Sequence, residues 1–117
     1  YRETQRRYVA GALFLPTDDQ ARKEHILDKM SCAPQHVMVS AMEGLHRYDP
    51  TAVAAHLKAP ALYIAADEPQ PRADMTRFHE ICPNLMFGQT VGSGHFCQLE
   101  VPEQINPMIE RFLTVVL

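Results

Sequence analysis

Gly92-Ser93-Gly94-His95-Phe96, which follows the apolar run Leu85 to Val91, is the stretch that decides the fold of this 117-residue chain. Two glycines beside a histidine predict an open loop that can carry an exposed imidazole into a cleft. Imidazole titrates near neutral pH and is the usual proton carrier in hydrolysis. His95 is therefore the candidate base of a hydrolytic site.

Residues 58–117 alternate between strand-like and helix-like segments. Ala59 to Ala66 is a short apolar run bounded by prolines, which is typical of a buried parallel strand. Residues 71–81 carry apolar side chains at spacings of three, residues 85–91 form a second strand, and residues 102–116 form a closing amphipathic helix. This order predicts an α/β fold in which two parallel strands are joined by a right-handed crossover.

Residues 1–57 show no strand-like alternation and predict successive helices. The first helix is expected over residues 2–15. Residues 17–20 have the form of a capping box, with a hydroxyl at the start and a glutamine three residues later, and predict the start of a second helix. Pro34 and Pro50 each mark the first turn of a further helix. We therefore expect a helical segment before the α/β segment.

Composition narrows the class of protein. The net charge of −3 gives no indication of the basic surface that binds nucleic acid or an anionic membrane. No apolar run approaches the ~20 residues of a membrane span, and no signal-peptide pattern opens the chain. Cys32, Cys82 and Cys97 cannot all pair, and their spacing matches no zinc module. We expect free thiols in a cytoplasmic protein, with no bound metal.

Two acidic residues, Asp67 and Glu68, follow the first expected strand. Functional groups gather at the carboxyl ends of parallel strands, and His95 lies just past the end of the second strand. If the strands are neighbours, a carboxylate there can accept the Nδ1 proton of the histidine and stabilise the imidazolium. The order of acid and then histidine occurs in one class of hydrolases.

The segments from Lys58 to Ala66 and from Gly92 to Asn106 carry a family resemblance. The first, with its acid pair, resembles the penultimate strand of an α/β-hydrolase, and the second resembles the histidine loop and last helix of that superfamily. Residues 1–57 resemble the inserted helical cap in general character. The resemblance implies that His95 is the catalytic base, that Asp67 or Glu68 is the acid, and that the substrate is a small-molecule ester or related compound. It implies no cofactor.

The choice between the two acids is open. Members of the superfamily usually show a glycine, two residues and then an aspartate before a proline, whereas Ala66-Asp67-Glu68-Pro69 is one residue shorter. Alignment through Pro69 selects Glu68, and side-chain type selects Asp67, to which we give a slight preference. Some members take the acid from an earlier strand.

The nucleophile of such an enzyme is absent from these residues. No G-x-S-x-G pattern occurs, nor one with Cys or Asp at its centre, and Ser93 lies in the histidine loop rather than at a strand-to-helix elbow. We therefore expect the C-terminal part of a hydrolase, inactive by itself. Its first strand would present an open edge, through which we expect the chain to self-associate or to bind the remainder of its parent.

Two other functions fit the sequence. The chain can be a non-catalytic interaction module that binds a partner through its helical half and the open sheet edge. It can also be a thiol-dependent enzyme that uses Cys97, because positions 95 and 97 of an extended stretch share a face.

Overall fold

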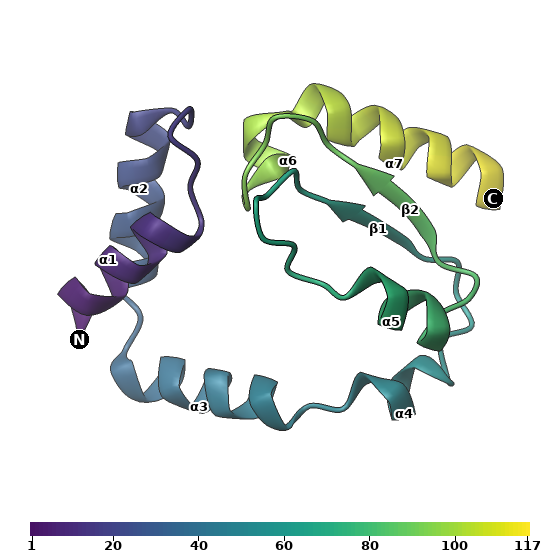
Figure 1. Ribbon diagram of the computed structural model, residues 1–117, viewed down its shortest axis with the longest axis horizontal. Coiled ribbons are helices and arrows are strands. Elements are labelled where there is room, and N and C mark those ends of the chain that lie inside the picture. The colour runs from purple at the N-terminus through teal and green to yellow at the C-terminus, as the bar shows by residue number, and fades with distance from the viewer. The chain divides into compact units, whose positions relative to one another are not determined.

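The computed structural model describes residues 1–117 and contains seven helices and a two-stranded sheet (Figure 1). The chain forms two compact units, Tyr1–Asp49 and Pro50–Leu117. Residues 50–57 fall in the second unit, whereas the sequence pattern groups them with the helical segment. The first unit is entirely helical and the second is a mixed α/β unit, as expected from the sequence.

In the first unit, helices α1 (Arg2–Ala12) and α2 (Gln20–Ser31) pack against each other. Each contributes one buried apolar side chain, Val9 from α1 and Leu27 from α2. At the edge of this contact, the guanidinium of Arg6 forms ion pairs with two carboxylates of α2. The helical hairpin therefore has a small apolar centre and a charged rim.

The capping box expected at Thr17 is wrong. Helix α2 begins three residues later, and its N-cap is Asp19, whose carboxylate accepts a hydrogen bond from the Arg22 N–H at 2.8 Å. The Asp18 side chain instead accepts from the Leu15 N–H at 2.7 Å and holds the turn that precedes the helix. An aspartate caps a helix at least as well as a threonine. The type of residue therefore does not decide between Thr17 and Asp19 as the N-cap of α2.

Helix α3 (Gln35–Arg47) follows Pro34, as expected. None of its residues is buried. The apolar side chains Val39, Met42 and Leu45 are 48%, 59% and 67% exposed. The helix is amphipathic, but its apolar side chains have no covering partner within this unit.

The second unit is built on the parallel strands β1 (Leu62–Ala65) and β2 (Met86–Gln89). Their register pairs Leu62 with Met86 and Ala65 with Gln89. The parallel pairing and the order of elements confirm the sequence prediction, although both strands are shorter than expected. The helices of this unit are α4 (Pro50–Ala54), α5 (Met75–Ile81), α6 (Cys97–Glu100) and α7 (Pro102–Val116).

Two helices cover opposite faces of this sheet (Figure 1). Tyr63 of β1 stacks on Phe87 of β2 at 6.2 Å between ring centroids, and meets the edge of Phe78 of α5 at 5.2 Å. Neighbouring positions along a strand point to the other face. There Gly88 lies so close to α7 that an added Cβ would come within 2.7 Å of the Met108 sulfur. The missing side chain of Gly88 therefore permits close packing of α7 on the sheet.

Helix α6 was not expected from the sequence. The carbonyl of Phe96 accepts hydrogen bonds from the N–H groups of Leu99 and Glu100, at 2.7 and 3.1 Å. His95 and Phe96 form a turn that leads into this helix. The expectation that residues 95 and 97 lie in an extended stretch is therefore wrong, because the chain turns here before it continues into α7.

Each strand of the sheet has one unpaired edge, because β1 and β2 pair only with each other. The buried apolar side chains of this unit are Cys82, Cys97 and Ile105. Parallel sheets normally have both faces covered by helices. Among the helices, none has the length and hydrophobicity required to cross a bilayer.

Candidate functional site

The two parallel strands bring two loops to the same edge of the sheet. The acid loop (residues 66–69) follows β1, and the histidine loop (residues 90–96) follows β2. Because the strands are adjacent and parallel, their carboxyl ends lie side by side. The residues expected to carry the chemistry, Asp67, Glu68 and His95, therefore all belong to this edge.

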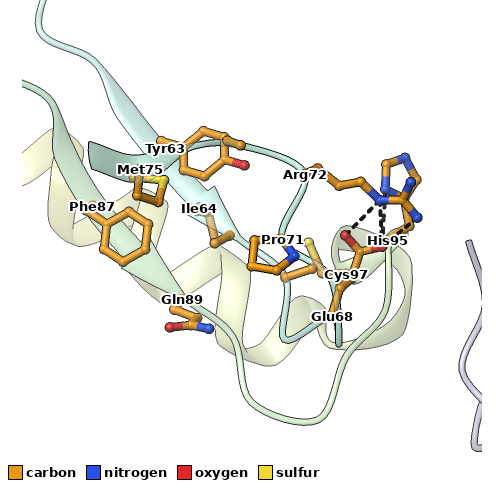
Figure 2. Close-up of a pocket in the computed structure, with 13 residues that line it drawn as sticks. Tyr63, Ile64, Glu68, Pro71, Arg72, Met75, Phe87, Gln89, His95 and Cys97 are labelled. Carbon is orange, nitrogen blue, oxygen red and sulfur yellow. Dashed lines mark hydrogen bonds and ion pairs between the residues drawn. The ribbon is translucent and has the colours of Figure 1, made fainter. Parts of the chain in front are cut away.

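Glu68 is the carboxylate that lies beside the histidine (Figure 2). Its Oε1 atom is 3.5 Å from Nδ1 of His95. The Glu68 side chain is only 8% exposed, whereas that of His95 is 40% exposed. The imidazole therefore presents its other nitrogen, Nε2, away from a largely buried carboxylate. This orientation suits a base whose tautomer is set by the carboxylate.

Arg72, Glu68 and His95 form a row of ionisable side chains, named here the charged row, in which His95 carries a charge only when it is protonated. Its Nε atom lies 3.4 and 3.2 Å from the two carboxylate oxygens of Glu68, and its Nη2 lies 3.5 Å from Oε1. A buried carboxylate requires a partner of opposite charge, and the guanidinium provides one. Arg72 was not identified as a site residue from the sequence. Its spacing of four residues from Glu68 is the one feature of the sequence that could have indicated this ion pair.

Asp67 has a different partner. Its Oδ2 atom accepts a hydrogen bond from the Gly92 N–H at 2.9 Å. Gly92 has a φ of +66°, a conformation that favours glycine, and a side chain added there would meet open space. The structure therefore brings Glu68, and not Asp67, to the imidazole, while Asp67 binds the backbone of the histidine loop.

Further hydrogen bonds hold the histidine loop, and they include two from the N–H and hydroxyl of Thr90 to the Ala65 carbonyl, at 3.0 and 3.2 Å. The amide of Gln104 on α7 makes two hydrogen bonds to the backbone of Val91, accepting at 2.8 Å and donating at 3.0 Å. Glu100 accepts from the Gly94 N–H at 2.5 Å. The hydroxyls of Thr90 and Ser93, both fully buried, lie 2.5 Å apart. The loop is thus fixed at each residue from position 90 to position 94.

A cavity of about 350 Å³ lies beside the charged row. Its volume is near the lower end of the range for small-molecule pockets. Figure 2 shows that aromatic and aliphatic side chains form one part of its lining and that the charged groups form the other. The lining includes Tyr63, Ile64, Met75, Phe87, Cys97 and the Glu68–His95 pair. The shape and lining suit a small ligand with one apolar and one polar end.

Cys97 lines the same cavity as a neutral thiol. Burial raises the pKa of this thiol, a backbone hydrogen bond at Gln98 opposes the change, and the charge of Glu100 adds to it. A nucleophilic cysteine needs a lowered pKa, since the thiolate is the reactive form. The environment of Cys97 is therefore opposite to that of a catalytic thiol. No group of three or more His, Cys, Asp or Glu side chains is arranged to hold a metal ion.

Comparison of the chain with protein-family models, curated proteins and solved structures finds no significant match.

Proposed function

We propose that this chain supplies the general base and its acidic partner to an enzyme of the α/β-hydrolase type, which cleaves esters or related bonds of small molecules. The observation that carries the proposal is the contact of 3.5 Å between His95 Nδ1 and Glu68 Oε1, at the carboxyl ends of two adjacent parallel strands and beside a cavity. The serine nucleophile and the oxyanion-binding groups belong to a part of the enzyme outside these residues.

In this proposal the proton moves through His95. With Nδ1–H directed at Glu68, the Nε2 atom takes the proton of the attacking hydroxyl and later gives it to the leaving group. The carboxylate of Glu68 stabilises the imidazolium that forms between these two steps. Arg72 also binds that carboxylate and contacts both of its oxygens, at distances of 3.2 to 3.5 Å. Glu68 is therefore the preferred acid, in place of Asp67.

The test replaces His95 by alanine in the protein that unites this chain with a nucleophile. Turnover of a p-nitrophenyl ester should fall by about 10³-fold or more, because nucleophile and base act as a unit. His56→Ala is the matched control, since His56 is exposed and lies outside the lining of the cavity. Retained turnover in His95→Ala, with normal folding, would contradict the proposal.

An interaction module is the second candidate function. It is favoured by the exposed apolar side chains of α3 and by the unpaired edges of the sheet. The His95→Ala variant distinguishes the two candidate functions. If the chain is an interaction module alone, this substitution leaves partner binding unchanged, and there is no ester turnover for it to affect. In the hydrolase, the same variant removes turnover while binding through α3 or the sheet edge persists.

A further inference from the structure

Two consecutive carboxylates hold the histidine loop at two points. Glu68 contacts the side chain of His95, and Asp67 binds the backbone of Gly92, three residues earlier. We propose that Asp67 is a positioning residue: it fixes the histidine loop to the acid loop and so sets the distance between the imidazole and Glu68. This inference rests on the proposed function and assigns a role to the acid that does not contact His95.

Asp67 is the one side chain of the acid loop that binds the backbone of the histidine loop. The contacts made by Gln104 and Glu100 come from helices that follow the histidine loop in the chain. They tie the loop to its own C-terminal helices. Thr90, at the start of the histidine loop, is tied to the end of β1 by two hydrogen bonds to the Ala65 carbonyl, at 3.0 and 3.2 Å. Beyond Thr90, the Asp67–Gly92 bond is the one hydrogen bond from an acid-loop side chain to the histidine-loop backbone. Strand pairing and Thr90 therefore fix the base of the histidine loop, and Asp67 fixes the part of the loop that is closer to His95.

The bond geometry favours a positioning role over a catalytic one. The Asp67 carboxylate is engaged at 2.9 Å by an N–H group, which is the length of a well-formed hydrogen bond. Glu68 and His95 are 3.5 Å apart, so their contact is sensitive to a small displacement of the loop. Gly92 has a φ of +66°, and because glycine also adopts other conformations readily, the bond from Asp67 helps to hold the loop in this one.

An amide substitution separates the two roles. In Asp67→Asn, the side-chain oxygen still accepts from the Gly92 N–H, but the negative charge is lost. In Asp67→Ala, both the acceptor and the charge are lost. A residue that positions the loop through its acceptor is rescued by asparagine, whereas an acid that stabilises an imidazolium is not. Glu68→Gln is the matched variant at the neighbouring position, because it removes charge and keeps shape.

Two measurements follow the variants. In the 117-residue chain, NMR measures solvent exchange of the Gly92 amide. We expect about tenfold faster exchange in Asp67→Ala, a change within about threefold in Asp67→Asn, and no change in Glu68→Gln, since a bond to a charged group is worth about one order of magnitude. In the enzyme that contains the nucleophile, kcat should fall in Asp67→Ala and Glu68→Gln, with KM little changed, and should be retained in Asp67→Asn.

A loss of kcat in Asp67→Asn as large as that in Glu68→Gln, with Gly92 exchange unchanged, would overturn the inference and make Asp67 the acid. Equal exchange in Asp67→Ala and the unsubstituted chain would overturn it as well. If Asp67→Ala does not fold, Asp67→Asn alone still decides between the roles. The proposed function fails separately: it fails when His95→Ala retains turnover, whatever the exchange at Gly92.

Discussion

Adjacent carboxylates in this chain have different partners, and the difference comes from the direction of their side chains. Glu68 faces the imidazole and is largely buried, while the exposed Asp67, in the same loop after β1, faces the backbone of Gly92. The contact with His95 and the burial of its side chain are the reasons to prefer Glu68 over Asp67 as the partner of the imidazole.

Cys97 should react slowly with iodoacetamide at neutral pH. Its pKa is raised by burial, so little thiolate forms, and we expect alkylation at least about tenfold slower than at the exposed Cys32. Because the folded-state pKa lies above the unfolded value of about 8.5, this thiol stabilises the fold below that pH, and the contribution is lost as the pH rises through the raised pKa.

Mass spectrometry of peptides after timed alkylation, from pH 7 to pH 10, measures the rate at each cysteine. Cys32 serves as the internal control in the same molecule. Rapid alkylation of Cys97 at pH 7 would contradict the raised pKa and would restore the thiol-dependent mechanism as a candidate.

The sequence was enough to select His95 and the acid pair as candidate site residues. It was not enough to predict which side chains contact one another. His95 and the acid pair could be found because glycine-flanked histidines and acids after apolar runs have recognisable local patterns. The choice of Glu68 depends on side-chain direction, which the sequence does not give. Gln104, Glu100 and Arg72 were missed because their hydrogen bonds depend on how loops approach helices, and no local periodicity reports that.

At the scale of elements, the closing helix was predicted best, whereas the first helix, expected over residues 2–15, ends at Ala12, and the helix-like segment 71–81 forms a helix only from Met75. Helix α7 spans Pro102–Val116, the expected range, because a proline at its first position and a sustained apolar stripe mark it clearly. Helix α6 has only four residues, too few for any periodicity to appear. Both strands are shorter than the apolar runs that contain them, since only four residues of each are paired.

Pro107 interrupts the interior of α7 and should weaken it. A proline there removes a backbone N–H donor and crowds the preceding turn, at a cost of about 3 kcal/mol in a helix interior. Pro107→Ala should therefore raise the free energy of unfolding by about 1–3 kcal/mol. Pro102→Ala is the matched control, because Pro102 occupies the first turn, where proline is tolerated, and its replacement should change stability little.

Chemical denaturation followed by circular dichroism measures both variants. An equal effect of the two substitutions, or a loss of stability in Pro107→Ala, would show that Pro107 has a packing role that outweighs its effect on the helix. Pro107 lines a groove between α7 and the sheet together with Met108 and Phe112. A loss of stability in Pro107→Ala would therefore have a structural explanation.

At the scale of the whole molecule, little apolar surface is buried. Five apolar side chains are buried in the 117 residues, and the sheet has two strands. A two-stranded sheet is marginal by itself, and an unpaired strand edge is a template for further pairing. The amino-acid pattern predicted the two strands and the open edge, because apolar runs and their order along the chain indicate a parallel pair.

We expect the isolated chain to associate through β1. The Ala61 carbonyl accepts from Met86 of β2, and the Ala65 carbonyl accepts from Thr90, directly after β2. The N–H of Ile64, at the alternate position, therefore points to the open edge. Ile64→Pro removes that donor and should lower the mass of the assembly toward that of a single chain. Ile64→Val keeps the N–H and is the control.

Size-exclusion chromatography with light scattering, over a range of concentrations, measures this mass. A monomer at all concentrations in the unsubstituted chain would contradict association through the edge. Equal masses in the two variants would place the contact elsewhere, with the exposed side chains of α3 as the next surface to test.

Nitrogen-15 NMR of the His95 imidazole tests the central geometry most directly. At alkaline pH, where histidine side chains are neutral, the proton should reside on Nδ1 in the unsubstituted chain and in Asp67→Asn, because Glu68 accepts it. In Glu68→Ala this preference should disappear. A proton on Nε2 in the unsubstituted chain, or the same spectrum in Glu68→Ala, would contradict the pairing of His95 with Glu68 and the mechanism built on it.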